Sequence, residues 1–411
     1  MSAKAKAKAA APATALLPYG RACIEADDVA AVTEVLTSDW LTTGPMVGRF
    51  ETALADAVNA PHAVVVSSGT AALHLAAKAL GIGPGDQVIV PAITFAATAN
   101  AARFVGADIV FADVDPLTGL MGPKEFEEAL TRAPRARAVF PVHFAGQCVP
   151  IMEIAAIARA RGLAVVEDAC HALGSRMVRD TRHLRVGDCA ESDFTVFSFH
   201  PVKTVAMGEG GALTTRDETM AARLRRLRSH GITREPGTFV ESALGFDSEG
   251  LPNPWYMEMQ ELGFNYRAND IQCALGASQL KKLQRFAKTR RDLVAVYDQA
   301  LRPLAPVVRP MPRLPGQEPC WHIYVALIDF EGLGVERGAV MRALAASGVG
   351  SQVHYVPLPL HPYYRALPSS AGSFPGAMAH YARCLSLPLY VGLTPADVRR
   401  VVDALADALK L

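Results

Sequence analysis

The sequence lacks the features that mark several large classes of protein. Its seven cysteines are scattered and include no CxxC pair, which excludes a zinc site of common spacing and a disulfide framework. Their odd number and low density are typical of reduced thiols in a cytoplasmic protein. Forty-one Lys and Arg against 40 Asp and Glu leave a formal net charge of +1, so nothing indicates nucleic acid or an anionic membrane as a partner. No stretch approaches the ~20 uninterrupted apolar residues of a membrane span.

What the sequence does contain is a regular alternation of short apolar runs and helix-length segments. With 411 residues, half of them apolar, the chain can bury a large core and is long enough for two or three domains. Continuous apolar strands separated by amphipathic helices predict a mostly parallel sheet covered on both faces. The Ala/Lys tract over residues 1–17 is a poor signal peptide, and we interpret it as a disordered tail. The predicted strands span residues 62–68, 86–92, 107–114, 137–144, 163–169 and 193–199.

The second half of the chain has a different texture. Residues 269–300 are helical in pattern and long enough to leave one domain and enter another. Beyond them, apolar runs at 322–330 and 350–358 and a helix near residues 337–347 predict a smaller α+β unit. Residues 234–262 are rich in Gly, Pro and aromatic residues. They predict either a long ordered excursion near a site or subunit interface, or a surface loop.

The first candidate site follows the first apolar run. In open α/β sheets, ligands bind at the carboxyl ends of the strands. Residues 67–71, SSGTA, lie at such an end and open a helix. Small residues there let backbone N–H groups and the helix dipole hold a phosphate, although Ser-Gly-Thr is also an ordinary N-cap. No GxGxxG follows this run, which excludes a simple nicotinamide dehydrogenase.

Ionisable side chains follow two later runs. Glu167 and Asp168 end the fifth run, where buried carboxylates are costly unless a cation or metal meets them. An N-cap by Asp168 is the structural alternative, and His171 follows one turn on. Ser198 and Lys203 follow the sixth run, ahead of a glycine-rich stretch that by itself indicates only a turn. A desolvated lysine loses its charge and becomes nucleophilic, which suits an imine with a cofactor aldehyde.

Together these elements indicate pyridoxal 5′-phosphate as the cofactor. This cofactor needs a phosphate cup at a helix N-terminus, a carboxylate such as Asp168 to keep its pyridine nitrogen protonated, and a lysine such as Lys203 to hold its aldehyde carbon. Phe95, after the second run, can stack on the ring, although a core phenylalanine is an equally good interpretation.

Long stretches of the sequence resemble the DegT/DnrJ/EryC1/StrS family of sugar aminotransferases. The likeness runs from about Tyr19 to the C-terminus. It implies the fold type I of pyridoxal-phosphate-dependent transferases (aspartate aminotransferase-like α/β). The implied domains are a large cofactor-binding domain with a mostly parallel, seven-stranded sheet over residues 18–285 and a small C-terminal α+β domain over residues 286–411. The likeness is carried by SSGTAALHLA, PAITFAATANA, VVEDACHALGS, FSFHPVKTVAMGEGGALTT, ELGFNYRANDIQCALGASQLKKL and SQVHYVPL.

The resemblance also implies roles for individual residues. Lys203 is the catalytic Schiff-base lysine, Asp168 the partner of the pyridine nitrogen, and His171 a contact of the ring hydroxyl. Asn265 reaches the cofactor phosphate from the neighbouring subunit, which implies a homodimer with composite sites. The implied cofactor-binding residues are Ser68, Gly69, Thr70, Phe95, Asp168, His171, Ser198, Lys203 and Asn265. The implied substrate-binding residues are Tyr19, Asp39, Trp40, Leu41, Thr42, Gly69, Ser198, Asn265, Gln352, Val353, His354 and Tyr355.

Three stretches, FSFHPVK, PWYMEMQELGFNYR and QVHY, further resemble members of the family that act in pseudaminic acid synthesis. The implied reaction moves the amino group of L-glutamate to C4 of a UDP-linked 4-keto-6-deoxy-N-acetylhexosamine. The glutamate skeleton leaves as 2-oxoglutarate. Arg228 and His230 are candidates to neutralise the diphosphate, unless they form a solvated basic helix end.

Three alternatives remain on the sequence alone. The first is another UDP- or dTDP-sugar aminotransferase acting at C3 or C4. The second is a sugar dehydratase on the same scaffold, against which Lys203 argues because those enzymes carry histidine at that position. The third is a non-catalytic regulator that binds the cofactor or a sugar nucleotide.

Overall fold

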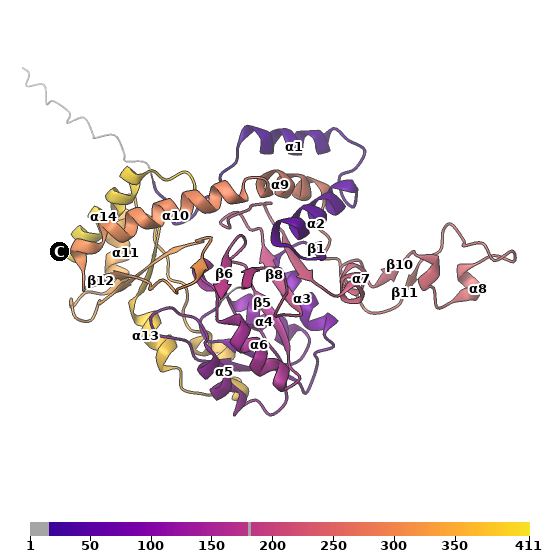
Figure 1. Ribbon diagram of the computed structural model, residues 1–411, viewed down its shortest axis with the longest axis horizontal. Coiled ribbons are helices and arrows are strands. Elements are labelled where there is room, and N and C mark those ends of the chain that lie inside the picture. Colours follow the sequence, from indigo (N-terminus) through magenta and orange to yellow (C-terminus); the bar gives the residue numbers. More distant parts are fainter. Residues whose placement is uncertain (1–15, 180–181) are drawn as a thin grey trace, which may run out of the picture.

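A computed structural model describes residues 16–179 and 182–411 of the chain (Figure 1). The disordered tail predicted for residues 1–17 lies outside the described residues except for its last two positions. At Leu17 that prediction is wrong, because the side chain is 7% exposed and the residue pairs in parallel with Val349. The Leu17 amide donates to the Gly348 carbonyl at 2.9 Å, and its carbonyl accepts from the Gly350 amide at 2.8 Å. Leu17 is therefore part of the folded core.

The central sheet has seven strands in the order β1-β9-β8-β5-β4-β2-β3. All six predicted strands are present and point the same way, which confirms the mostly parallel α/β fold. β9 is the exception, since it runs antiparallel to both β1 and β8. It was not predicted, because its Gly-rich start has the pattern of a turn. The strands are β1 (His62–Val66), β2 (Gln87–Pro91), β3 (Asp108–Ala112), β4 (Ala136–Val139), β5 (Ala164–Asp168), β8 (Phe194–Ser198) and β9 (Gly211–Thr215).

Helices cover both faces of this sheet. Along β1 the side chains alternate between two hydrophobic cores, as a strand buried on both faces requires. Val64 and Val66 enter the larger core with α3, whereas Val65 enters a second core with Phe50 of α2. The α-helices are α1 (Ala26–Leu36), α2 (Pro45–Val58), α3 (Gly69–Ala79), α4 (Ala96–Phe104), α5 (Pro123–Leu130), α6 (Ile151–Ala160), α7 (Glu218–Leu227), α8 (Ser242–Gly245), α9 (Asp270–Leu280), α10 (Leu283–Ala300), α11 (Arg337–Ala346), α12 (Pro362–Arg365), α13 (Pro375–Arg383) and α14 (Pro395–Leu409).

The C-terminal part is a smaller α+β unit, as the sequence predicts. Its antiparallel sheet has the order β12-β14-β15. Residues 350–358 form no strand there, only an isolated bridge between Gln352 and Ser386, because Pro357 cannot donate to a ladder and the chain turns away. None of the helices in the two described ranges is long and apolar enough to cross a membrane. The remaining strands are β6 (Arg176–Arg179), β7 (Arg182–Arg185), β10 (Ile232–Thr233), β11 (Glu258–Met259), β12 (Val308–Pro310), β13 (Gln317–Glu318), β14 (Tyr324–Ile328) and β15 (Cys384–Leu387).

The single helix predicted over residues 269–300 is two helices, α9 and α10, with Lys282 in the break between them. Lys282 is 8% exposed, and its Nζ lies 2.6–3.1 Å from carboxylate oxygens of Glu25, Asp27 and Asp28. These ion pairs hold α1 against α9 (Figure 1). The predicted domain boundary after residue 285 falls in the first turn of α10 and stays a prediction.

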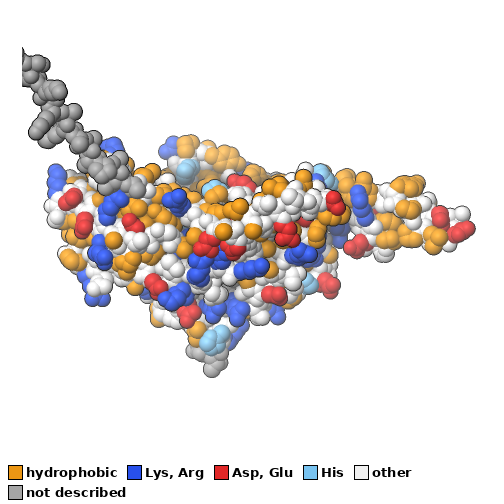
Figure 2. Space-filling view, turned by 90° about the horizontal axis from the view of Figure 1, so that it is seen from above, with side chains coloured by type: hydrophobic (Ala, Val, Ile, Leu, Met, Phe, Trp, Pro, Cys, Tyr) orange, Lys and Arg blue, Asp and Glu red, His pale blue; other side chains and the backbone are white. Residues whose placement is uncertain are grey.

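Residues 232–262 form an arm that projects from the body of the molecule (Figure 1). β10 and β11 pair antiparallel at its base, and α8 lies further out. The predicted excursion is thus ordered in the structure. Figure 2 shows hydrophobic side chains along the arm. In residues 232–262, Val240 is 74%, Trp255 70% and Leu262 68% exposed. Large apolar side chains held in solvent by an ordered segment indicate a contact surface.

Candidate active site

The ends of β1, β5 and β8 meet at one edge of the sheet and open into a cavity of about 620 Å³. The structure brings thirteen of the predicted site residues together there, from segments far apart in the chain. Their roles in binding and catalysis stay predictions at this point. The predicted residues that line the cavity are Tyr19, Ser68, Gly69, Thr70, Phe95, Asp168, His171, Ser198, Lys203, Gln352, Val353, His354 and Tyr355.

The loop after β1 has the geometry of an anion cup. Ser68 caps α3, and its Oγ accepts from the Ala71 amide at 3.1 Å. At Gly69 a Cβ would lie 2.9 Å from the Cβ of Ser198, so only glycine fits between the two strand ends. Residues 69 and 70 begin α3, whose N-terminal N–H groups and dipole favour a negative group. The loop therefore suits a phosphate, with the Ser198 hydroxyl beside it.

Asp168 is a buried carboxylate held by neutral donors. Its Oδ2 accepts from Thr98 Oγ1 at 2.6 Å and its Oδ1 from the Cys170 amide at 3.1 Å. Thr98 lies on α4 and is itself bonded to Thr94 at 2.7 Å. Asp168 forms no ion pair with any residue in the described ranges, so its charge is left for a cation in the cavity. Sequence reasoning missed Thr98, because an ordinary helical threonine carries no signal of this contact.

Lys203 lines the cavity, and its Nζ forms no hydrogen bond or ion pair with other described residues. Burial lowers the pKa of its amine, although the charges of Cys170 and Asp168 oppose that shift. Its backbone amide donates to the His200 carbonyl at 2.8 Å, which fixes the turn that carries it. An unpaired amine with a lowered pKa is the form in which lysine acts as a nucleophile and base.

Three aromatic side chains pack on the far wall. His171 Nε2 lies 3.1 Å from the Tyr355 hydroxyl, and the His322 ring centroid is 4.4 Å from that of His171. Burial, followed by the charge of Lys203, holds the pKa of both histidines well below the usual range. In the part of the chain that the structure describes, Nδ1 of each ring is buried without a hydrogen-bond partner. Sequence reasoning missed His322, because it lies 151 residues from His171 and outside every quoted motif.

The rest of the wall belongs to the predicted sugar side of the pocket. Tyr19 and His354 pack with ring centroids 5.8 Å apart, and His354 Nδ1 lies 2.8 Å from Ser386 Oγ. Burial lowers the pKa of His354 to about 4. Phe95 is 60% exposed and lies 6.1 Å, between ring centroids, from Tyr355. It is not a core phenylalanine, so its other interpretation, a stacking partner at the cavity mouth, stays open.

The structure places the remaining predicted residues outside this cavity. Residues 39–42 are exposed on the segment between α1 and α2, with Trp40 56% and Leu41 50% exposed, and Asp39 and Thr42 beside them. Asn265 is also exposed, on a segment bonded to Ser229 and, through Tyr266, to the amide of Ser67. Within one chain, therefore, none of these five side chains reaches the cavity.

For Arg228 the prediction of a diphosphate contact is wrong in this chain. The side chain is buried behind β1, where its Nη1 donates to Glu51 Oε1 at 2.5 Å and to the Val65 carbonyl at 2.6 Å. A guanidinium used in this way is structural, since removing it would leave the Glu51 carboxylate buried and unpaired. His230, by contrast, is exposed beside the Asn265 segment, with its amide bonded to the Phe264 carbonyl.

These residues fit pyridoxal phosphate as a cofactor. The loop at Gly69, where a larger residue would collide with Ser198, forms an anion cup. Asp168 has no counter-ion among the described residues, and the amine of Lys203 has no partner among them. Two buried ring nitrogens, on His171 and His322, lack partners within the described ranges. Buried polar atoms are seldom left unpaired unless they serve a ligand or water. Each group of the cofactor thus has a complementary group in the cavity.

Comparison with known proteins gives a consistent result. Residues 22–406 match the DegT/DnrJ/EryC1/StrS aminotransferase family. The chain is similar to the spore coat polysaccharide biosynthesis protein SpsC of Bacillus subtilis strain 168, with 40% identity over 396 residues, 96% of this chain and 97% of that protein.

Two solved structures have the same fold. Helicobacter pylori PseC, an aminotransferase involved in the biosynthesis of pseudoaminic acid, has a TM-score of 0.86 and 27% identity over 96% of this chain and 99% of its own. The putative sugar aminotransferase Spr1654 of Streptococcus pneumoniae, solved in a PLP form, has a TM-score of 0.84 and 27% identity over the same shares.

Proposed function

The chain belongs to the DegT/DnrJ/EryC1/StrS aminotransferase family, and from this premise we propose its substrates. As a member it is a pyridoxal-phosphate-dependent sugar aminotransferase. We propose that it moves the amino group of L-glutamate to C4 of a UDP-linked 4-keto-6-deoxy-N-acetylhexosamine, in the synthesis of pseudaminic acid for a surface glycan. The similarity to PseC supports this sugar, and the similarity to SpsC supports a surface polysaccharide.

One observation carries the proposed catalytic role of this chain's residues. The amine of Lys203, which has no partner among the described residues, and the carboxylate of Asp168, which has no counter-ion among them, share one cavity with an anion cup. A binding protein without catalysis gains nothing from placing an unpaired lysine amine with a lowered pKa in its site, and the cost of desolvating it would go unrecovered.

The chain's own residues divide the work of the reaction. When bound, pyridoxal phosphate supplies an electron sink for the charge left on a substrate carbon that loses its proton. Residues 68–70 and Ser198 hold the phosphate, and Asp168 keeps a proton at the ring nitrogen. The Lys203 amine, its pKa lowered by burial, takes the proton from the substrate carbon and returns it. Donor and acceptor use the same site in turn, so the kinetics are ping-pong.

We also propose a homodimer whose sites are composite. Asn265, His230 and Trp40 are exposed and do not reach the cavity of their own chain, and the apolar arm projects away from the body (Figure 2). In a C2 dimer each chain can give these groups to its partner. His230 then remains a candidate for the diphosphate in the partner's site, whereas Arg228 does not.

The test is a substrate panel. Purified holoenzyme is incubated with L-glutamate and UDP- or dTDP-linked 3- and 4-ketosugars, and the products are identified by mass and by the position of the new amine. We expect amination at C4 of the UDP-linked N-acetylated 4-ketosugar, with 2-oxoglutarate in equal amount. Lys203→Ala is the matched control and should give no product.

Turnover of dTDP sugars alone, or amination at C3, would favour a related nucleotide-sugar aminotransferase instead. Binding of sugar nucleotides without turnover of any member of the panel would favour the non-catalytic regulator.

A further inference from the structure

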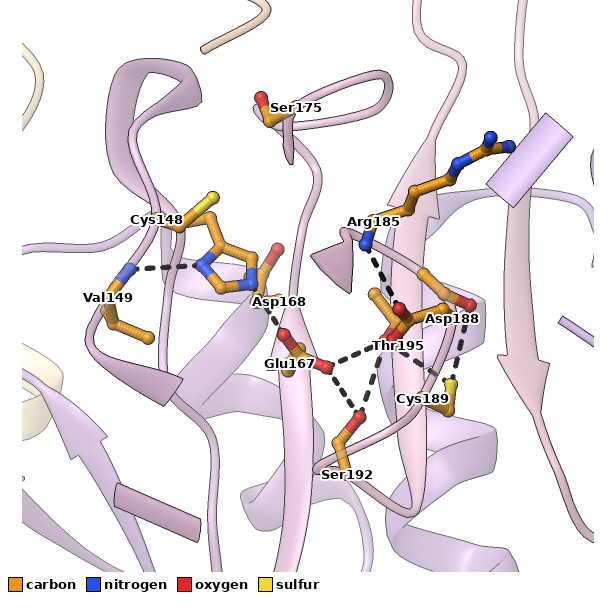
Figure 3. Close-up of polar contacts among 12 residues, drawn as sticks. Cys148, Val149, Glu167, Asp168, Ser175, Arg185, Asp188, Cys189, Ser192 and Thr195 are labelled. Atoms are coloured by element: carbon orange, nitrogen blue, oxygen red, sulfur yellow. Dashed lines mark hydrogen bonds and ion pairs between the residues drawn. The ribbon is translucent and has the colours of Figure 1, made fainter. Parts of the chain in front are cut away.

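Glu167 is a buried carboxylate that the reaction as described does not use. It precedes Asp168 on β5 and is 5% exposed. Side chains alternate along a strand, so Glu167 points to the face opposite the cavity. Figure 3 shows it directed toward Ser192 and Thr195. A second carboxylate next to Asp168 needs a reason, because burying one costs free energy.

Three side chains donate hydrogen bonds to the Glu167 carboxylate. Oε1 accepts from Ser192 Oγ at 2.5 Å and from Thr195 Oγ1 at 3.0 Å, and Oε2 lies 2.7 Å from His143 Nε2. Burial alone would raise the pKa of Glu167, but its interactions with His143, Ser192 and Thr195 outweigh burial and lower it. The carboxylate is therefore ionised at neutral pH.

The hydrogen bonds of His143 assign its proton. Nδ1 accepts from the Val149 amide at 3.2 Å, so it carries no hydrogen. Nε2 then carries the ring's one proton and donates it to Glu167. In this hydrogen-bond arrangement His143 donates to Glu167 as a neutral imidazole, and the other partners of the carboxylate, Ser192 and Thr195, are uncharged. Its negative charge remains uncompensated.

The segment that carries His143 also forms hydrogen bonds with the backbone of Asp168. The Asp168 amide donates to the Pro141 carbonyl at 2.8 Å, and the His143 amide donates to the Asp168 carbonyl at 3.0 Å. Residues 141–143 thus hold the backbone of Asp168 and the side chain of Glu167 together. Any movement of this strand end would break several buried hydrogen bonds at once.

We propose that Glu167 is a positioning residue for the reaction: clamped by His143, it fixes the strand end that carries Asp168 and adds a second negative charge that favours a proton on the cofactor's ring nitrogen. This inference rests on the proposed role of Asp168. It explains why two adjacent buried residues are both carboxylates, on opposite faces of one strand.

The other ionisable groups nearby do not cancel this charge. Toward Glu167 face His143, Cys148, Cys189 and Asp188. Burial raises the pKa of both thiols, that of Cys189 to about 11, and burial also raises the pKa of Asp188. The groups that face Asp168 from the cavity side are Cys170, Lys203 and Tyr355.

The primary test is Glu167→Gln in the holoenzyme. The hydroxyls of Ser192 and Thr195 can turn to accept from the new amide, so the network survives while the charge is lost. With cofactor labelled with nitrogen-15 in its ring, NMR gives the midpoint of ring-nitrogen protonation. Losing a negative charge near the ring nitrogen disfavours its protonated form. We therefore expect the midpoint to fall by roughly one pH unit.

A second variant provides an independent test of the inference if Glu167→Gln does not fold. Ser192 is only half-buried, so Ser192→Lys can bring a positive charge to the carboxylate from the solvent side. It should lower the midpoint in the same direction. Thr195→Val removes a donor but keeps the charge, and should leave the midpoint in place. Glu51→Gln removes a buried carboxylate that is paired with Arg228, and should cost stability without moving the midpoint.

The outcomes separate this inference from the role of Asp168. If Asp168→Asn moves the ring-nitrogen midpoint while neither Glu167→Gln nor Ser192→Lys does, Glu167 is a purely structural group and the inference is wrong. If Asp168→Asn leaves the midpoint unchanged as well, the proposed role of Asp168 fails first. An equal shift in Thr195→Val would also overturn the inference, because the charge is intact there.

Discussion

A methyl group at Gly211 would collide with the backbone of the predicted phosphate cup. Gly211 begins β9, the antiparallel strand between β1 and β8. A Cβ built there lies 2.3 Å from both the carbonyl carbon and oxygen of Ser68, and 2.5 Å from the Gly69 amide nitrogen. Ordinary contact begins near 3.4 Å, so the loop must move by roughly 1 Å. A backbone cannot turn aside as a side chain can.

We therefore expect Gly211→Ala to weaken cofactor binding about tenfold or more. A shift of this size breaks at least one charged hydrogen bond to the phosphate, which is worth ~1.5–3 kcal/mol. Overpacking should also lower the free energy of unfolding by ~1–3 kcal/mol. The assay is titration of the folded apoprotein with pyridoxal phosphate, followed by visible absorption, with denaturant unfolding beside it.

Gly210→Ala is the matched control. The three atoms nearest its Cβ would all belong to the side chain of Met207, at 3.1–3.4 Å, and the sulfur and terminal methyl of that side chain can move. We expect near-normal cofactor affinity for this variant. Wild-type affinity in Gly211→Ala would refute the reasoning, because the phosphate would then not depend on the position of the loop.

Three further predictions concern catalysis, assembly and pH. Lys203→Ala should lose the visible absorption of the lysine-bound cofactor and all turnover while its circular dichroism stays normal; turnover without added amines would remove Lys203 from the reaction. Mixing Lys203→Ala with Asn265→Asp subunits should restore activity toward half the wild-type value per mixed dimer, because one of its two sites is intact; subunit exchange without recovery would place Asn265 outside the partner's site. Burial lowers the pKa of His380 to about 4, against roughly 6.5 for an unfolded histidine. The unfolded chain then binds more protons between these pH values, so the free energy of unfolding should fall by up to ~3 kcal/mol as pH drops from 6.5 to 4. Denaturant unfolding of His380→Leu should show a smaller fall, and an equal fall in both proteins would contradict this assignment.

The strand-end residues could be predicted from sequence for a simple physical reason. Parallel strands bring their carboxyl ends to one edge, so Ser68, Asp168 and Ser198 had to lie near one another once the strands were identified. Lys203 follows because five residues of turn cannot carry it far from the end of β8. Prediction from pattern works where chain connectivity itself limits distance.

Contacts between distant segments could not be predicted in this way. Arg228 and Glu51 are 177 residues apart, and nothing in RLRSHGITR distinguishes a solvated arginine from one buried against a carboxylate. The pairing of His322 with His171 depends on how the C-terminal unit packs on the sheet. The tract that ends at Leu17 is dominated by Ala and Lys, and nothing in it indicates a pairing with Val349 far along the chain.

The arm has a consequence for how such an enzyme diverges. It leaves the body at β10 and returns at β11 through a ladder of two residue pairs, and no strand of the seven-stranded sheet passes through it. Insertions, deletions or substitutions between these strands can therefore accumulate without disturbing the register of β5 and β8, in which Asp168 pairs with Val196. If the arm meets a second copy as proposed, lineages could remodel the surface offered to the partner's substrate while inheriting the cofactor machinery unchanged. Specificity for new sugars would then evolve on this peripheral segment, where an unfavourable substitution leaves the rest of the protein folded.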